Sequence, residues 1–179
     1  MILLSTPRLI MQPIQADDWA FFLRLYQTPD VMRFIGDIET HAQVHSRFEQ
    51  RLGHWDRYSD FWLCLLIREK DTGAAVGLTG FFPDWRPYKQ GEVGFILAPE
   101  HQRKGYAAES LREVLNFAFD QCGFHRLQAN VLEGNDASRR VLEKCGFLME
   151  GRLRDSYRIG DEWKNDWLLG LLASDPRPQ

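Results

Sequence analysis

The sequence predicts an α/β domain of the α+β type, in which helices flank a mixed, mostly antiparallel, twisted sheet of about seven strands. Apolar runs of strand length and segments of helical periodicity follow one another unevenly: a strand, two or three helices, three strands, a helix, a strand, a helix and two strands. Consecutive strands joined by short turns favour antiparallel pairs, and a helix between two strands allows a parallel crossover. Hydrophobic residues make up 44% and charged residues 26% of the chain, which is a globular composition.

The first half of the chain is predicted to hold one strand, the first helices and a hairpin. Residues 8–14 form the strand, Asp17 can cap a helix that reaches Tyr26, Pro29 begins a short helical piece, and a longer helix covers roughly residues 41–58. The apolar runs 61–67 and 75–82 flank an Asp-Thr-Gly turn and form the hairpin.

The second half continues with elements that end at clear stop signals. We expect a central strand at 91–97 before Pro99, a helix at 106–121, a strand at 126–132, a helix between the cap Asn135 and Gly146, and a hairpin from Phe147 that turns near Gly160 and ends in a strand at 163–172.

Length and cysteine content bound the organisation and location. The 179 residues fit one domain, expected at 1–174, with a loose tail at 175–179. The N-terminus does not resemble a signal peptide, and no stretch approaches the roughly 20 apolar residues of a membrane span. The three cysteines are odd in number and lie in apolar stretches, which predicts buried free thiols in a reducing compartment. We expect a cytoplasmic protein, a monomer or a homodimer.

The net charge and the spacing of possible metal ligands argue against nucleic-acid-binding and metal-binding proteins. The net charge is −3 and the pI about 6.0, so no basic face favours direct nucleic-acid binding. The histidines are scattered and no Cys/His cluster has metal-ligand spacing, so no metal is expected.

The segment Gln102 to Ala107 has the properties of an anion-binding loop. It opens a helix, whose first backbone N–H groups are unpaired and carry partial positive charge. Gly105 allows close approach of a ligand, Ala107 adds little bulk, and Arg103 and Lys104 add charge. By themselves these features also fit a turn with solvated charges. The patterns that bind a nucleoside triphosphate or a dinucleotide are absent.

Gln102-x-x-Gly105-x-Ala107 resembles the Q/R-x-x-G-x-G/A signature of the GNAT acetyltransferase superfamily, which cradles the pyrophosphate of acetyl-CoA. The likeness extends in order along nearly the whole chain to the RimJ/RimL-type branch, the ribosomal-protein N-acetyltransferases. The segments that carry it are Thr6-Pro7-Arg8-Leu9, Gly91-Glu92-Val93-Gly94-Phe95 with Leu97-x-Pro99, Asn135-x-x-Ser138 and Glu143-Lys144-x-Gly146-Phe147. The resemblance implies the GNAT acyl-CoA N-acyltransferase fold, with a sheet splayed between its fourth and fifth strands.

The same resemblance implies acetyl-CoA as co-substrate and a set of residues that bind it. In the family, backbone groups of the central strand hold the pantetheine arm and the thioester oxygen, and the loop holds the pyrophosphate. Carried over, the cofactor-binding residues are Phe95, Ile96, Leu97, Gln102, Arg103, Lys104, Gly105, Tyr106, Ala107, Asn135, Ser138 and Lys144.

Glu92 and Ser138 are the candidate catalytic residues. Strand alternation places Glu92 on the same face as Gly94, which would leave room for a substrate or water. Glu92 is interpreted either as a general base, direct or through water, or as a strand-end carboxylate paired with an arginine. By resemblance, Ser138 would lie near the CoA sulfur and help to protonate the thiolate, although a hydroxyl there could also serve only local capping.

Two departures from the family pattern affect the catalytic assignment. Leu142 takes the place of a tyrosine acid that many GNAT enzymes carry in the last helix. No glutamate aligns with the carboxylate base that the branch uses on the following strand, where Asp155 and Tyr157 are nearby but displaced.

The expected reaction is direct transfer of the acetyl group from acetyl-CoA to a primary amine. A protein N-terminal α-amine is favoured, because about a third of such amines but only about 0.1% of lysine amines are neutral near pH 7.5. The alternatives are a small amine (polyamine, amino acid or antibiotic), a non-catalytic acyl-CoA sensor and, more distantly, a nucleotide-binding protein. Phe82, Trp85 and Tyr157 are expected to contact the acceptor, although such aromatics can also complete a core.

Overall fold

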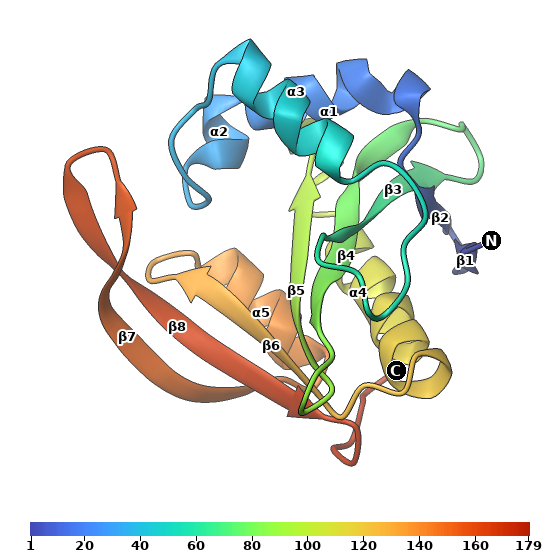
Figure 1. Ribbon diagram of the computed structural model, residues 1–179, viewed down its shortest axis with the longest axis vertical. Helices are drawn as coiled ribbons and strands as arrows, with labels where there is room; N and C mark the ends of the chain where they lie inside the picture. The colour runs from blue at the N-terminus through green and yellow to red at the C-terminus, as the bar shows by residue number, and fades with distance from the viewer.

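One twisted sheet of eight strands organises the protein, as shown by a computed structural model that describes residues 1–179 (Figure 1). The strands lie in the order β1-β2-β3-β4-β5-β6-β8-β7. Their bounds are β1 Leu4–Ser5, β2 Leu9–Pro13, β3 Leu63–Glu69, β4 Ala75–Asp84, β5 Gln90–Leu97, β6 Arg126–Leu132, β7 Leu148–Ile159 and β8 Glu162–Leu172. Every neighbouring pair is antiparallel except β5 and β6. The strand beyond the predicted seven is β1, a two-residue strand too short to predict from its sequence.

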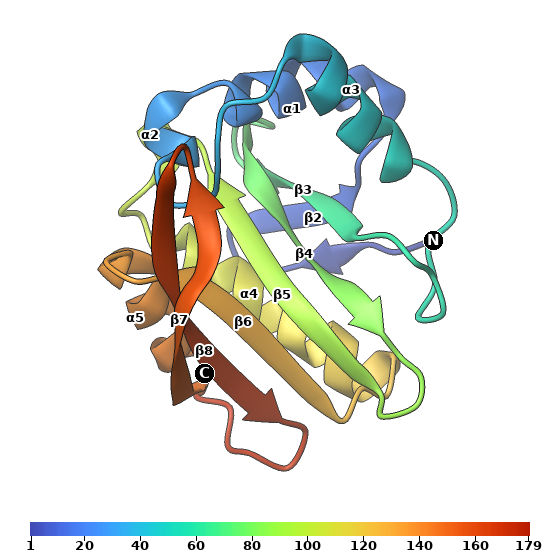
Figure 2. The ribbon, with the colours of Figure 1, turned by 60° about the vertical axis from the view of Figure 1, so that its left-hand side comes forward.

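Helices cover both faces of this sheet (Figure 2). Their bounds are α1 Trp19–Tyr26, α2 Pro29–Met32, α3 His41–Gln50, α4 Tyr106–Asn116 and α5 Asp136–Lys144. Buried side chains of α1, α2 and α3 pack on one face in a cluster of 12 residues. The helices α4 and α5 pack on the other face in a cluster of 27. None of the helices combines the length and the apolar character that crossing a membrane requires.

Two helix boundaries differ from the predictions for local reasons. The helix expected to run to residue 58 ends at Gln50, since Gly53 takes a left-handed φ of 100° and Trp55 turns into the core. The first helix begins with a 3-10 turn in which Asp18, not Asp17, accepts a hydrogen bond from the Gln15 N–H. The helix predicted at 106–121 has that span, although its last part, Phe117–Gln121, is a π-helical turn.

The C-terminal tail was expected to be loose, but it packs against the body of the protein. Arg177 forms an ion pair with Asp120 at 3.0 Å, and the Asp175 side chain accepts a hydrogen bond from the Leu172 N–H. A side chain at Gly146 would meet the backbone of Pro176 at 2.8 Å. The tail therefore covers the end of α5.

The sheet splits between β5 and β6. β5 pairs with β4 as far as Leu97, whereas it pairs with β6 only from Gln90 to Glu92. Beyond Glu92 the two strands diverge, and the β6-facing edge of β5 has no strand partner. This is the predicted splay between the fourth and fifth strands, counted without β1.

Candidate active site

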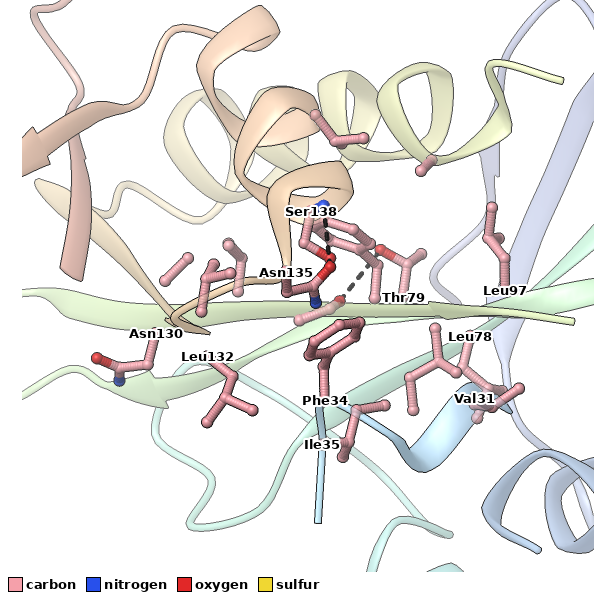
Figure 3. Close-up of a pocket in the computed structure, with 18 of the residues that line it drawn as sticks. Val31, Phe34, Ile35, Leu78, Thr79, Leu97, Asn130, Leu132, Asn135 and Ser138 are labelled. Carbon is pink, nitrogen blue, oxygen red and sulfur yellow. Dashed lines mark hydrogen bonds between the residues drawn. The ribbon is translucent and has the colours of Figure 1, made fainter. Parts of the chain in front are cut away.

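A cavity of about 1610 Å³ occupies the split in the sheet. Its walls come from the segment after α2, from β3 to β6, from the loop before α4, from α5 and from the β7–β8 hairpin. Figure 3 shows Asn135 and Ser138 on one side of the central strands, with Phe34 and Ile35 facing them from the other. Typical small-molecule pockets measure about 300–1000 Å³, so this cavity has room for two substrates at once.

The loop before α4 forms one end of the cavity. Arg103 and Gly105 both take left-handed φ values, 63° and 81°, and α4 begins directly afterwards at Tyr106. Alternation of left-handed and ordinary residues turns successive N–H groups toward one point, and the helix N-terminus adds partial positive charge there. A Cβ at Gly105 would lie 3.3 Å from the Arg8 guanidinium. The backbone therefore fits the pyrophosphate cradle that the sequence predicts.

Only some side chains of this loop point into the cavity, and others bond to neighbouring residues. Gln102 lines the cavity, but its amide donates a 3.1 Å hydrogen bond to the Leu97 carbonyl and so ties the loop to the end of β5. Lys104 does not line the cavity, and its ammonium lies 3.5 Å from His101 Nδ1. Arg103, Arg140 and Lys144 remain as cations in the cavity wall.

A clamp that the sequence did not reveal holds this loop in place. Glu109, in the first turn of α4, accepts hydrogen bonds from the Thr6 hydroxyl at 2.6 Å and the Arg8 N–H at 3.0 Å. The side chain is only 15% exposed. The segment Thr6-Pro7-Arg8-Leu9 therefore belongs to the support of the loop, and its partner lies 101 residues away from Arg8.

The start of α5 faces the unpaired edge of β5. Asn135 caps α5, as predicted, by accepting a hydrogen bond from the Ser138 N–H at 3.3 Å. The Ser138 hydroxyl is half-buried in the cavity wall and has no protein partner, so capping does not use it. Phe95, Ile96 and Leu97 line the cavity opposite, with backbone groups on the side from which β6 has departed. Leu142 is fully buried, and an apolar side chain cannot replace a tyrosine acid.

Glu92 stands where β5 and β6 diverge. Its carboxylate is half-buried and accepts a 3.1 Å hydrogen bond from the Asn130 amide, not from an arginine. Register places Glu92, Asn130, Leu132 and Asp166 on one face of the sheet, and all four line the cavity. The space beside Gly94 is not open: the Trp62 ring lies 3.1 Å from where its Cβ would be.

Asp166 is a second acid that the sequence reasoning overlooked. It lies on β8 and accepts a 2.9 Å hydrogen bond from the Ser156 hydroxyl. Asp155, the acid considered instead, does not line the cavity and sits in a β-bulge with a φ of 47°. A bulge disturbs the alternation of a strand, which explains why Asp155 does not line the cavity although Leu153 and Tyr157 on either side of it do.

The three predicted acceptor-binding aromatics occupy different places. Tyr157 lines the cavity, and its hydroxyl donates a 2.6 Å hydrogen bond to the Ile35 carbonyl. Phe82 and Trp85 do not line it. Phe82 contacts the Trp62 ring edge-on at 6.0 Å between ring centroids, and Trp85 packs on Phe124 at 5.1 Å. Trp85 packs against the larger buried cluster, so completion of the core is the better interpretation for it, whereas Phe82 is half-buried and belongs to neither cluster.

Comparison with known proteins relates this site to one family. The profile of the acetyltransferase (GNAT) domain matches residues 8–148. YoaA of Bacillus subtilis, an uncharacterized N-acetyltransferase, is 30% identical over 155 residues, 85% of this chain and 86% of YoaA. YdaF of the same organism, named provisionally as a ribosomal N-acetyltransferase, is 26% identical over 153 residues, 69% of this chain and 79% of YdaF.

Solved structures show the same fold. A GNAT-family acetyltransferase from Bacillus anthracis superposes with a TM-score of 0.83 at 23% identity, covering 96% of this chain and 99% of its own. A spermidine N-acetyltransferase from Vibrio cholerae, crystallised with CoA and spermine, gives a TM-score of 0.82 at 19% identity, covering 94% and 98%.

Proposed function

The chain belongs to the GNAT acetyltransferase family and is an N-acetyltransferase, and from its site we propose that it moves the acetyl group of acetyl-CoA directly to an α-amine at a protein N-terminus. One observation carries the choice of acceptor. The carboxylates in the cavity wall near β5 are each engaged by a neutral hydrogen-bond donor, Glu92 by Asn130 and Asp166 by Ser156. A site of this kind suits an amine that is already largely neutral.

The residues at the loop end fit acetyl-CoA. The Gly105 cradle would hold the pyrophosphate, with Arg103, Arg140 and Lys144 as further cations, and the free edge of β5 would pair with the pantetheine arm. Acetyl-CoA would supply the activated acyl group. The two substrates would then meet beside residues 94–96 in one ternary complex.

The chain's own residues would then serve the transfer. Backbone N–H groups at the open edge of β5 would stabilise the developing oxyanion. Glu92 would take the proton that the amine loses on attack, directly or through a water. The Ser138 hydroxyl, free of protein partners, would donate a hydrogen bond to the departing thiolate.

Charge in the cavity also favours an α-amine over a polyamine. Away from the loop end, five acids line the wall: Asp30, Asp37, Glu39, Glu92 and Asp166. Four arginines line the same region: Arg33, Arg47, Arg51 and Arg158. Five acids against four arginines leave this part of the wall close to neutral, and a polycation gains little from such a surface. Small amines remain the second candidate, because those acids do line the cavity and the spermine-bound Vibrio cholerae enzyme shares the fold.

An acceptor panel tests the proposal. Free thiol release and mass spectrometry would follow acetyl-CoA mixed with three acceptors: peptides with a free N-terminus, the same peptides with a blocked N-terminus and an internal lysine, and spermidine. We expect acetylation at the α-amine of the first. Turnover only with spermidine would transfer the proposal to small amines, and acetyl-CoA binding without turnover across the panel would favour a sensor.

A further inference from the structure

The guanidinium of Arg51 lines the cavity without an anionic partner. Arg51 follows α3 and donates a 3.0 Å hydrogen bond to the Tyr26 hydroxyl, with Cys64 Sγ at 4.0 Å. It takes part in none of the ion pairs in the structure, whereas Arg47, four residues earlier, pairs with Glu39 at 2.6 Å. Tyr26, Arg51 and Cys64 all face the cavity.

This charge is costly where it lies. Arginine stays protonated at any physiological pH. Burial raises the pKa of Tyr26 and of the Cys64 thiol, so both neighbours are neutral under the same conditions. A half-buried cation without a counter-charge loses hydration, and Arg51 gains in return only neutral partners: the Tyr26 hydroxyl, the Cys64 sulfur and the aromatic rings of Phe22, Tyr26 and Trp62 within 6 Å. Its remaining N–H groups are donors that an anion in the cavity could use.

Arg51 also stands close to the reacting centre. Its Cζ lies 5.7 Å from the centre of the Trp62 ring, and the edge of that ring is 3.1 Å from the Cβ position of Gly94 on β5. One indole ring therefore separates the guanidinium from the strand that would hold the thioester. A carboxylate one or two residues away from an acceptor amine lies within roughly 4–8 Å of it, which spans this gap.

We propose that Arg51 binds a carboxylate of the acceptor, so that the enzyme selects amines whose carrier bears a negative charge close to the amine. This inference rests on the proposed transfer to an α-amine and specifies its substrate class. The guanidinium fork matches a carboxylate through two parallel hydrogen bonds. The carboxylate could be an acidic side chain at the first or second position of a peptide, or the α-carboxylate of a free amino acid.

Matched acceptors test the inference within one protein preparation. The ratio of kcat/KM would be measured for C-terminally amidated peptides that differ only in Glu or Gln at the second position, and for a free amino acid against its amide. In the unmodified enzyme we expect the carboxylate form to be favoured about 10-fold or more, the usual value of a charge-assisted hydrogen bond. If the Glu/Gln peptides give the larger ratio, Arg51 binds an acidic side chain; if the amino acid and its amide do, Arg51 binds the α-carboxylate.

Variants then assign the preference to Arg51. Arg51→Gln should bring the ratio close to one, and Arg51→Lys should keep part of it. Arg33→Gln removes an exposed arginine from the same cavity and should leave the ratio unchanged. Because each ratio is internal to one variant, partial loss of folded protein cancels.

The possible results separate this inference from the proposed function. Equal use of Glu and Gln peptides by the unmodified enzyme would overturn the role of Arg51 and leave α-amine transfer standing. Turnover of free amino acids but of no peptide, with the preference lost in Arg51→Gln, would overturn the protein acceptor and support Arg51. Turnover of spermidine alone would overturn both.

Discussion

Arg8 binds Glu109 through two kinds of donor, its backbone N–H at 3.0 Å and its guanidinium at 2.7 Å. The contact joins the chain before β2 to the first turn of α4. It also places the Arg8 guanidinium 4.5 Å from the centre of the Tyr106 ring, beside the cradle formed by Gly105. The geometry of the cradle therefore depends on a residue that does not line the cavity.

Glu109→Gln should weaken acetyl-CoA binding by about 3-fold to 10-fold and destabilise the protein by about 1 kcal/mol, because it replaces charge-assisted hydrogen bonds with neutral ones. Burial acts to raise the pKa of Glu109, but the hydrogen bonds from Thr6 and Arg8 outweigh it and hold the pKa below its usual 4.5. The stabilisation is therefore complete above that pH and is lost as the pH falls through the lowered pKa. Thermal unfolding of both proteins from pH 7 to pH 3 should show a difference that shrinks with acid; a constant difference would contradict the clamp.

Gly105→Glu should abolish acetyl-CoA binding, because it fills the cradle with bulk and negative charge. Gly105→Ala should weaken binding about 10-fold, since its φ of 81° is strained for any side chain. Gly73→Glu is the matched control: it has a similar φ of 74° and nothing lies within 4 Å of its Cβ position. Calorimetric titration with acetyl-CoA distinguishes the two sites, and retained affinity in Gly105→Glu would exclude the loop as the cofactor site.

Glu92→Gln should lower kcat/KM about 10-fold to 100-fold at neutral pH, with nearly unchanged acetyl-CoA affinity. The expected loss of rate is at or below the usual contribution of a general base, because a large fraction of α-amine molecules is already neutral. Asp166→Asn is the companion variant, since it changes the other acid on the same face of the sheet. If Asp166→Asn alone slows the reaction across the pH range, the base is Asp166 and the assignment of Glu92 fails.

Local signals were sufficient to predict most of the fold. The Asn135 cap, the Gly146 stop and the Asp-Thr-Gly turn each depend on neighbouring residues, and the corresponding elements lie where expected. The resemblance supplied the splay between β5 and β6, which no local pattern encodes.

Contacts across long separations could not be predicted in the same way. Glu109 meets Arg8 across 101 residues, and Tyr157 meets Ile35 across 122. Which side chains of the last hairpin face inward depends on a bulge between Leu153 and Tyr157, where three residues of β7 stand opposite one residue of β8 and Ser156, not Asp155, lines the cavity. The unpaired charge of Arg51 is visible only when three separate elements, α1, the end of α3 and β3, are brought together.

Tyr157→Phe should raise the KM for the acceptor several-fold and leave acetyl-CoA affinity unchanged. The Tyr157 hydroxyl bonds the Ile35 carbonyl, and the Gly160 N–H donates to Asp37 at 2.8 Å, so the tip of the β7–β8 hairpin is tied to the segment after α2. The variant removes one of these two ties from the acceptor side of the cavity, far from the Gly105 cradle.

The pH dependence of this tie gives an independent check. Burial raises the pKa of Tyr157 above 10.0, so the hydroxyl remains a donor throughout the neutral range and the tie is lost only as the pH rises through that raised value. Between pH 6 and pH 9 the ratio of acceptor KM for Tyr157→Phe and the unmodified enzyme should therefore stay constant. Hydrogen exchange of the Gly160 and Ile159 amides would show whether the hairpin tip opens more often in the variant. Unchanged exchange together with an unchanged KM would mean that Asp37 alone holds the hairpin.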